Sequence, residues 1–170
     1  RLYSSPMTAA DEVFEEFDHE FDRLLHAGSE GVEFRSALGA VLNTVYQLRE
    51  HLRSTLGDKQ YFALADSSDD GKTTEGVVAL RGIQVHSLAR PLSPKNDTLY
   101  PGQHIFPGPY TFPGANLTWI DPDDVADELD MSRIRKDTLD RYRRHARGKM
   151  VLYTLDDARR FLAVNIAASQ

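Results

Sequence analysis

Proline divides this chain into parts that can fold in different ways. Seven of the eight prolines in the 170 residues lie between Pro91 and Pro122. Proline lacks a backbone donor and clashes with the preceding helical turn, so a long helix cannot cross this stretch. The residues before it have the apolar periodicity of helices. We therefore predict a helical N-terminal part and a boundary near residue 90.

Two long helices are predicted at the start of the chain, over Thr8–Ala27 and Glu30–Leu56. In both, apolar residues recur at spacings of three and four, which places them on one face of a helix. Gly28 and Gly57 follow as stop signals. The apolar residues of the second predicted helix are Leu38, Val41, Leu42, Val45, Leu48 and Leu52.

Shorter helices are predicted between Gly57 and the proline-rich stretch. Asp58 is expected to cap a helix over Lys59–Ala65, because a short carboxylate suits that position. The Ser- and Asp-rich segment Asp66–Gly71 reads as a polar loop. A fourth helix is expected from about Thr73, continuing through Ile83 and Val85 and ending before Pro91.

The proline-rich stretch predicts short strands and then a helix start. Gln103–Phe106 and Tyr110–Thr118 are expected to be strands separated by Pro-Gly turns. Asp121 followed by Pro122 and further carboxylates is typical of a helix N-terminus, so a helix is expected over Pro122–Leu129.

The C-terminal residues predict a basic helix over Arg133–Arg147, a strand over Lys149–Tyr153 and a short final helix from Thr154 through Leu162. The predicted fold class is α+β, mostly α. A helical bundle over residues 8–92 is followed by a small β-containing C-terminal appendage over 93–170. The sequence leaves open whether the two parts are separate domains or one integrated domain.

Composition excludes several classes of protein. The chain has no cysteine, so thiolate zinc sites, thiol nucleophiles and disulfide frameworks are excluded. No apolar run approaches the roughly 20 residues that cross a bilayer, so no membrane span is expected. A net charge of −6 argues against a generally basic surface that coats nucleic acid. The expectation is a cytoplasmic protein, since the lack of disulfides fits a reducing compartment.

Charge is unevenly distributed along the chain. Asp11–Asp22 holds many acidic residues and no lysine or arginine, whereas Ser132–Arg160 holds ten lysines and arginines against four acidic residues. Phosphate binding to RNA, an acidic protein partner and a solvated helix face all remain open for this basic segment. Its densest part contains His145 and the five residues that we predict to bind substrate. These five are Arg141, Arg143, Arg144, Arg147 and Lys149.

Arg81 and His86 are the candidate catalytic residues. They form an Arg-x-x-x-x-His step at the end of the predicted fourth helix. Imidazole can act as a general acid or base near neutral pH, and a guanidinium can neutralise charge on a phosphate. The structural alternatives are a helix C-terminus for His86 and an ion pair for Arg81. The candidate partners in that ion pair are Asp18, Asp22 and Glu50.

The segment Ala79-Leu80-Arg81-Gly82-Ile83-Gln84-Val85-His86, preceded by two long helices and a polar loop, resembles the HEPN superfamily over residues 8–92. The resemblance implies a metal-independent endoribonuclease of a toxin–antitoxin or antiphage system. It further implies a homodimer that joins two Arg–His pairs in one cleft and needs no cofactor. Other members are non-catalytic interaction modules. Gly82 stands where active members usually carry a polar residue, so the sequence leaves open whether the protein is an enzyme.

Two other groups of residues have both a chemical and a structural interpretation. Asp18, His19 and Asp22 lie within one helical turn, and a solvated acidic surface is favoured there over a metal site. A second group could stack a nucleic-acid base, although capping the bundle is favoured. Its members are Tyr100, His104, Tyr110 and Trp119.

Overall fold

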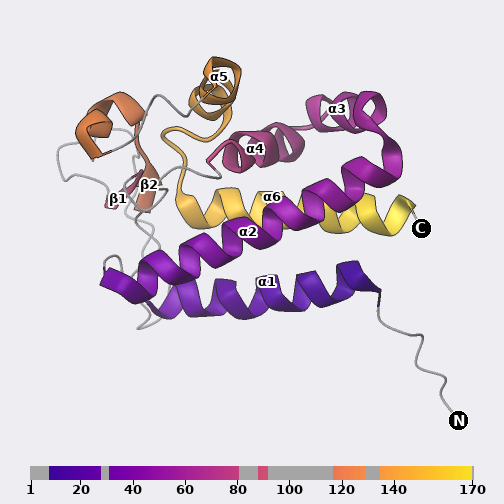
Figure 1. Cartoon of the computed structure of the whole chain (residues 1–170), viewed down its shortest axis with the longest axis horizontal. Coiled ribbons are helices and arrows are strands. Elements are labelled where there is room, and N and C mark those ends of the chain that lie inside the picture. Colours follow the sequence, from indigo (N-terminus) through magenta and orange to yellow (C-terminus); the bar gives the residue numbers. More distant parts are fainter. Residues whose placement is uncertain (1–7, 28–30, 81–87, 92–116, 129–134, 170) are drawn as a thin grey trace, which may run out of the picture.

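The computed structural model describes residues 8–27, 31–80, 88–91, 117–128 and 135–169. These residues form a helical bundle with one small antiparallel sheet (Figure 1). The three long helices are α1 (Ala9–His26), α2 (Gly31–Leu56) and α6 (Val151–Ser169). The shorter helices α3, α4 and α5 lie on the side of α2 and α6 that faces away from α1. Their bounds are Asp58–Asp66, Asp69–Val78 and Lys136–His145.

The sheet has two strands, β1 (Ala89–Pro91) and β2 (Leu117–Trp119), with Ala89 opposite Trp119. The mostly α fold class is therefore confirmed for the described residues, and the β part there amounts to three residues per strand. β2 coincides with the end of the predicted strand Tyr110–Thr118. The start of that strand and all of Gln103–Phe106 lie outside the described residues.

The first predicted helix is confirmed, with its start fixed by a reciprocal cap. The Thr8 hydroxyl accepts a hydrogen bond from the Asp11 amide at 3.3 Å, and Asp11 Oδ2 accepts one from the Thr8 amide at 2.8 Å. Such a box satisfies amides that the first helical turn leaves without partners. Phe17 and Leu24 are buried on the face that packs against α2.

The second predicted helix is also confirmed, and all six residues of its apolar stripe are buried. It ends before Gly57, whose φ of 78° lies in the left-handed region that glycine adopts without strain. The prediction that Asp58 caps the next helix is wrong, because Gly57 occupies the cap position. Asp58 instead accepts hydrogen bonds from Arg53 at 2.7 and 2.9 Å.

The predicted loop Asp66–Gly71 is mostly helical, which corrects the prediction. α3 continues to Asp66 and α4 begins at Asp69. Ser68 stabilises the start of α4 after this short connection. Its hydroxyl caps the helix by accepting a hydrogen bond from the Gly71 amide at 3.1 Å. The segment's polar residues are therefore cap and first-turn residues.

α4 is shorter than the predicted fourth helix. It ends at Val78, where the chain tightens and the Leu80 amide donates to the Val77 carbonyl at 3.0 Å. Such a tight last turn is a common way for a helix to close. α4 therefore does not extend over Ala79 and Leu80 as predicted. The part of the prediction that covers Ile83 and Val85 lies outside the described residues, which omit 81–87.

The predicted strand Lys149–Tyr153 is wrong, and the final helix predicted from Thr154 through Leu162 is present but longer at both ends. α6 begins at Val151 and is 19 residues long. A run of five residues fits strand and helix periods equally well, and the buried residues Val151, Leu155 and Leu162 follow the helical period. The strand-like contact at this point is a single bridge between Met150 and Thr118.

The prediction that Asp121 caps a helix is confirmed, but the helix that follows is a 3₁₀ helix and not an α-helix. Asp121 Oδ1 accepts from the Asp123 amide at 3.1 Å. The following segment, η3 (Pro122–Glu128), is a 3₁₀ helix interrupted at Val125, where φ is −134°. After it, α5 lies within the predicted basic helix Arg133–Arg147.

Residues from both sides of position 90 share one hydrophobic core. Leu38 and Leu48 of α2 belong to the same buried cluster as Trp119, Tyr142 and Leu155. α6 packs against α2 and α4 and so closes the bundle. The proposed division at residues 92 and 93 stays a prediction, because residues 92–116 are not described. Among the helices that are described, none has both the length and the apolar character needed to cross a membrane.

Candidate functional site

Arg81 and His86 lie outside the described residues, but the residues on either side of their segment are placed. Leu80 and Leu88 are both fully buried. The Leu88 carbonyl accepts a hydrogen bond from the Ile120 amide at 2.9 Å. Both ends of the segment 81–87 are therefore anchored in the core.

β2 connects this segment to the basic run. On one side β2 pairs with β1, which begins two residues after position 87. On the other side the Trp119 amide donates to the Lys149 carbonyl at 3.0 Å, and the Gly148 amide donates to the Trp119 carbonyl at 2.7 Å. Gly148 has a φ of 79°, which lets the chain turn between α5 and α6. The end of the basic run is thus one strand away from β1.

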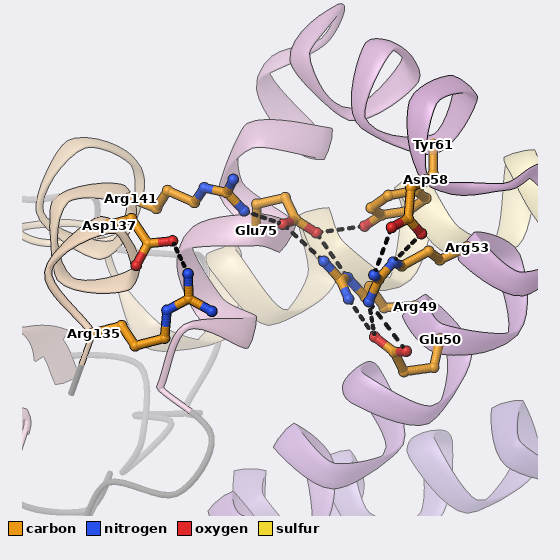
Figure 2. A network of polar contacts seen from close by, with 9 residues as sticks. All are labelled: Arg49, Glu50, Arg53, Asp58, Tyr61, Glu75, Arg135, Asp137 and Arg141. Carbon is orange, nitrogen blue, oxygen red and sulfur yellow. Dashed lines mark hydrogen bonds and ion pairs between the residues drawn. The ribbon is translucent and has the colours of Figure 1, made fainter. Parts of the chain in front are cut away.

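A buried carboxylate, Glu75 on α4, joins four helices (Figure 2). Its Oε1 and Oε2 accept from Arg49 Nε at 3.0 Å and Nη2 at 3.1 Å. Tyr61 on α3 donates its hydroxyl to Oε1 at 2.6 Å, and Arg141 on α5 donates Nη1 to Oε2 at 3.0 Å. In Figure 2, Glu75 lies between Arg141 on one side and Arg49 with Tyr61 on the other.

The surroundings of Glu75 keep its partners protonated. Burial by itself lowers the pKa of Arg49, but the hydrogen bonds and charge of Glu75 raise it above its ordinary value. Burial raises the pKa of Tyr61, and the nearby Glu75 carboxylate raises it further. Both groups therefore remain hydrogen-bond donors at neutral pH.

Phe62 packs beside the same network. The guanidinium groups of Arg141, Arg49 and Arg53 lie 5.2, 5.5 and 5.8 Å from the centre of its ring. Within the described part of the chain, every buried side-chain polar atom has a hydrogen-bond partner. The network therefore links the helices, and its charged groups have partners of opposite charge within the molecule.

Of the five predicted substrate-binding residues, Arg141 belongs to this network. Arg143 and Arg147 have carboxylate partners outside it. Arg143 donates to Asp121 Oδ1 at 3.2 Å and lies 2.6 Å from Asp123. Arg147 donates to Asp121 Oδ2 at 2.5 Å. Partial burial raises the pKa of Asp121, but hydrogen bonds, above all that from Arg147, lower it overall. Much of the basic run is thus neutralised within the molecule.

Arg144 and Lys149 have a different environment around His145, the last residue of α5. Arg144 is exposed, and Lys149 Nζ donates to the Thr73 hydroxyl at 2.8 Å. The pKa of His145 is lowered by its partial burial and then by the positive charges of Lys149, Arg144 and Lys72, with Asp66 acting in the opposite direction. Three cations from α4, α5 and the connection to α6 therefore act on one imidazole.

Sequence reasoning missed Glu75, Asp121 as an ion-pair partner, and Lys72. Glu75 lies 26 residues from Arg49 and 66 from Arg141, so no local spacing connects them. Asp121 was recognisable only as a helix cap. Lys72 precedes Thr73, which meets Lys149 across 76 residues of chain. None of these pairings leaves a periodic signal.

The two remaining groups have structural roles where they are described. Asp18 accepts from Arg159 at 2.6 and 2.7 Å, and no metal-binding group of three side chains occurs among residues that the structure describes. Trp119 is buried, and its Nε1 donates to the Thr154 hydroxyl at 2.7 Å. Tyr100, His104 and Tyr110 lie outside the described residues.

The acids considered as partners of Arg81 are occupied in part. Besides the Asp18–Arg159 pair, Glu50 pairs with Arg49 and with Arg53. Asp22 lies 3.6 Å from His26.

No family model matches the chain, and neither a curated protein nor a solved structure matches it.

Proposed function

We propose that the protein is a HEPN-like, metal-independent endoribonuclease of a bacterial or phage defence or toxin-type system. Arg81 and His86 are its catalytic pair, and a homodimer brings two such pairs together. The observation that carries the proposal is the anchoring of their segment. Buried Leu80 and Leu88 flank this segment, and β2 lies between β1, which begins at Ala89, and the cation-rich end of α5. A short segment held at both ends can keep two side chains in a defined geometry.

The proposed reaction uses the RNA itself as the nucleophile. His86 removes the proton of a 2′-hydroxyl, the resulting oxygen attacks the adjacent phosphorus, and the bond to the 5′-oxygen breaks. Arg81 stabilises the negative charge that develops on the phosphate oxygens. The leaving 5′-oxygen takes up a proton, and a 2′,3′-cyclic phosphate remains on the other fragment.

A non-catalytic interaction module is the second candidate, and one observation favours it. Arg141, Arg143 and Arg147 are each paired with a carboxylate of the same chain. An RNA strand would have to compete with those acids for these three arginines. A protein that binds an acidic partner through the remaining cations would meet no such requirement.

Cleavage of RNA in EDTA distinguishes the two candidates. Wild-type protein, Arg81→Ala, His86→Ala and an Arg135→Ala control are compared at equal folding, checked by thermal melting. Arg135 is a suitable control because its side chain is 81% exposed. We expect cleavage by wild type and by the control, and none by either active-pair variant. Intact RNA with every protein would contradict the nuclease and favour the interaction module.

A further inference from the structure

Three cations remain without close carboxylate partners at the end of α5. Among the described residues, no ion pair involves Arg144 or Lys149, and the bond of Lys149 goes to a hydroxyl. Lys72 has one carboxylate, Asp69, at 3.8 Å, and that aspartate is 98% exposed. An ion pair at this distance with one almost fully exposed partner contributes little.

These cations contrast with Arg141, Arg143 and Arg147 of the basic run. Arg141, Arg143 and Arg147 each have a carboxylate oxygen within 3.2 Å. The two sets differ in their partners. One set pairs with Glu75 and Asp121, and the other places three positive charges around His145, with Asp66 as the opposing charge.

We infer that Lys72, Arg144 and Lys149 form a binding site for a phosphate group of an RNA strand, beside the imidazole of His145. Lysine ammonium groups attract phosphate as point charges, and an arginine fork can donate two parallel hydrogen bonds to its oxygens. Thr73 holds Lys149 in place through one hydrogen bond, which leaves further donors of the ammonium group for the ligand.

His145 suits this position because it adds a donor without another full charge. Its lowered pKa favours the neutral ring, in which one nitrogen donates and the other accepts. α4 and α5 are close here: a β-carbon added to Gly76 would lie 3.0 Å from the β-carbon of His145. The close packing fixes the backbone and β-carbon of His145 relative to α4, the helix that carries Lys72.

The site is independent of Arg81 and His86 in its residues, but it rests on the proposed function for the source of the phosphate. Lys149 borders β2, and β1 lies on the other side of β2. An RNA strand held here is therefore bound close to the anchored end of the segment that contains the proposed catalytic pair.

Fluorescence anisotropy with a labelled single-stranded RNA tests the site. The RNA carries 2′-O-methyl groups throughout, so it cannot be cleaved and binding is measured alone. Wild type is compared with Lys72→Gln/Lys149→Gln and with Arg135→Gln/Lys136→Gln. The second pair removes the same charge from exposed residues roughly 14 Å along the α5 axis from His145. Thermal melting checks that each variant is folded.

Each phosphate contact with single-stranded nucleic acid contributes about 0.7 to the slope of log K against log salt. We therefore expect the first double variant to bind more weakly and, because the site holds one phosphate group, to lower the magnitude of this slope by about 0.7. The control should retain the wild-type slope. Equal slopes for wild type and Lys72→Gln/Lys149→Gln would overturn the site, and so would wild-type binding of inorganic phosphate without binding of RNA.

The same measurement separates this inference from the proposed nuclease. Arg81→Ala and His86→Ala should abolish cleavage of ordinary RNA, whereas Lys72→Gln/Lys149→Gln should weaken binding of the uncleavable RNA. Binding by wild type without cleavage of ordinary RNA would contradict the nuclease and leave the phosphate site supported. Cleavage by wild type, together with wild-type binding by Lys72→Gln/Lys149→Gln, would support the nuclease and contradict the phosphate site.

Discussion

Glu75 accepts hydrogen bonds from side chains of three other helices. Arg49 comes from α2, Tyr61 from α3 and Arg141 from α5. A buried ion pair adds little net stability compared with apolar packing, but removing one partner leaves an uncompensated buried charge. The arrangement of these four helices therefore depends on one carboxylate.

Replacing Glu75 by Gln should destabilise the fold by about 3–5 kcal/mol, because buried Arg49 loses its buried partner and keeps only the partly exposed Glu50 as a counter-charge. Tyr61→Phe should cost less, about 1–2 kcal/mol, since it removes a single hydrogen bond to a charged group. Urea unfolding followed by circular dichroism measures both. An unfolding free energy of Glu75→Gln within about 0.5 kcal/mol of wild type would contradict this account.

His145 should make stability depend on pH. The charged and titratable groups that act on it are Lys149, Arg144, Lys72 and Asp66, and its pKa in the folded state lies below the ordinary value of 6.5. As pH falls below 6.5, the unfolded state binds a proton before the folded state does. The contribution of His145 is therefore complete above that pH and is lost as pH falls towards the folded-state pKa.

Urea unfolding at several pH values between about 5 and 8 tests this. His145→Gln cannot titrate, so it should show a smaller loss of unfolding free energy at acidic pH than wild type shows. Two curves that fall in parallel would show that the pH dependence comes from other groups.

At the scale of elements, α4 is a central helix built from small and polar residues. It packs against α2, α3, α5 and α6. Its buried residues include Thr73, Thr74, Glu75 and two glycines, Gly71 and Gly76. The glycines let neighbouring backbones approach closely, so the helix is positioned by contact and by the Glu75 network more than by large apolar side chains.

Gly71→Ala should therefore destabilise the protein by about 1–3 kcal/mol or more. The new β-carbon would lie well inside van der Waals contact of the Ala65 carbonyl oxygen, and backbone atoms cannot move aside cheaply. Gly39→Ala is the matched control on α2, because nothing lies within 4 Å of its added β-carbon. It should raise stability by about 0.5–1 kcal/mol through helix propensity. A loss of stability in the control similar to that in Gly71→Ala would contradict the close-packing argument.

The elements that sequence could predict are those with local signals. The stripe from Leu38 to Leu52 and the cap at Thr8 fix α2 and the start of α1. α6 was misread at its start, since five residues of alternating character do not distinguish a strand from a buried helix. The pairs of Glu75 and Asp121 were not predictable, because they join residues brought together only by the packed bundle.

At the scale of the whole molecule, the chain returns on itself so that its two parts form one core. α6 packs against both α2 and α4, and Trp119 of β2 donates to Thr154 of α6. This closure places the end of the basic run next to the sheet that follows residues 81–87 (Figure 1). The proposed catalytic pair and the inferred phosphate site are thus properties of the closed bundle.

The most direct test of the proposed nuclease is the chemistry of the RNA ends it leaves. Wild-type protein is incubated in EDTA with a defined RNA, and the fragments are weighed by mass spectrometry. A 2′,3′-cyclic phosphate, lost with His86→Ala or Arg81→Ala, is the predicted result. Fragments that carry a 3′-hydroxyl, or RNA that stays intact, would contradict it.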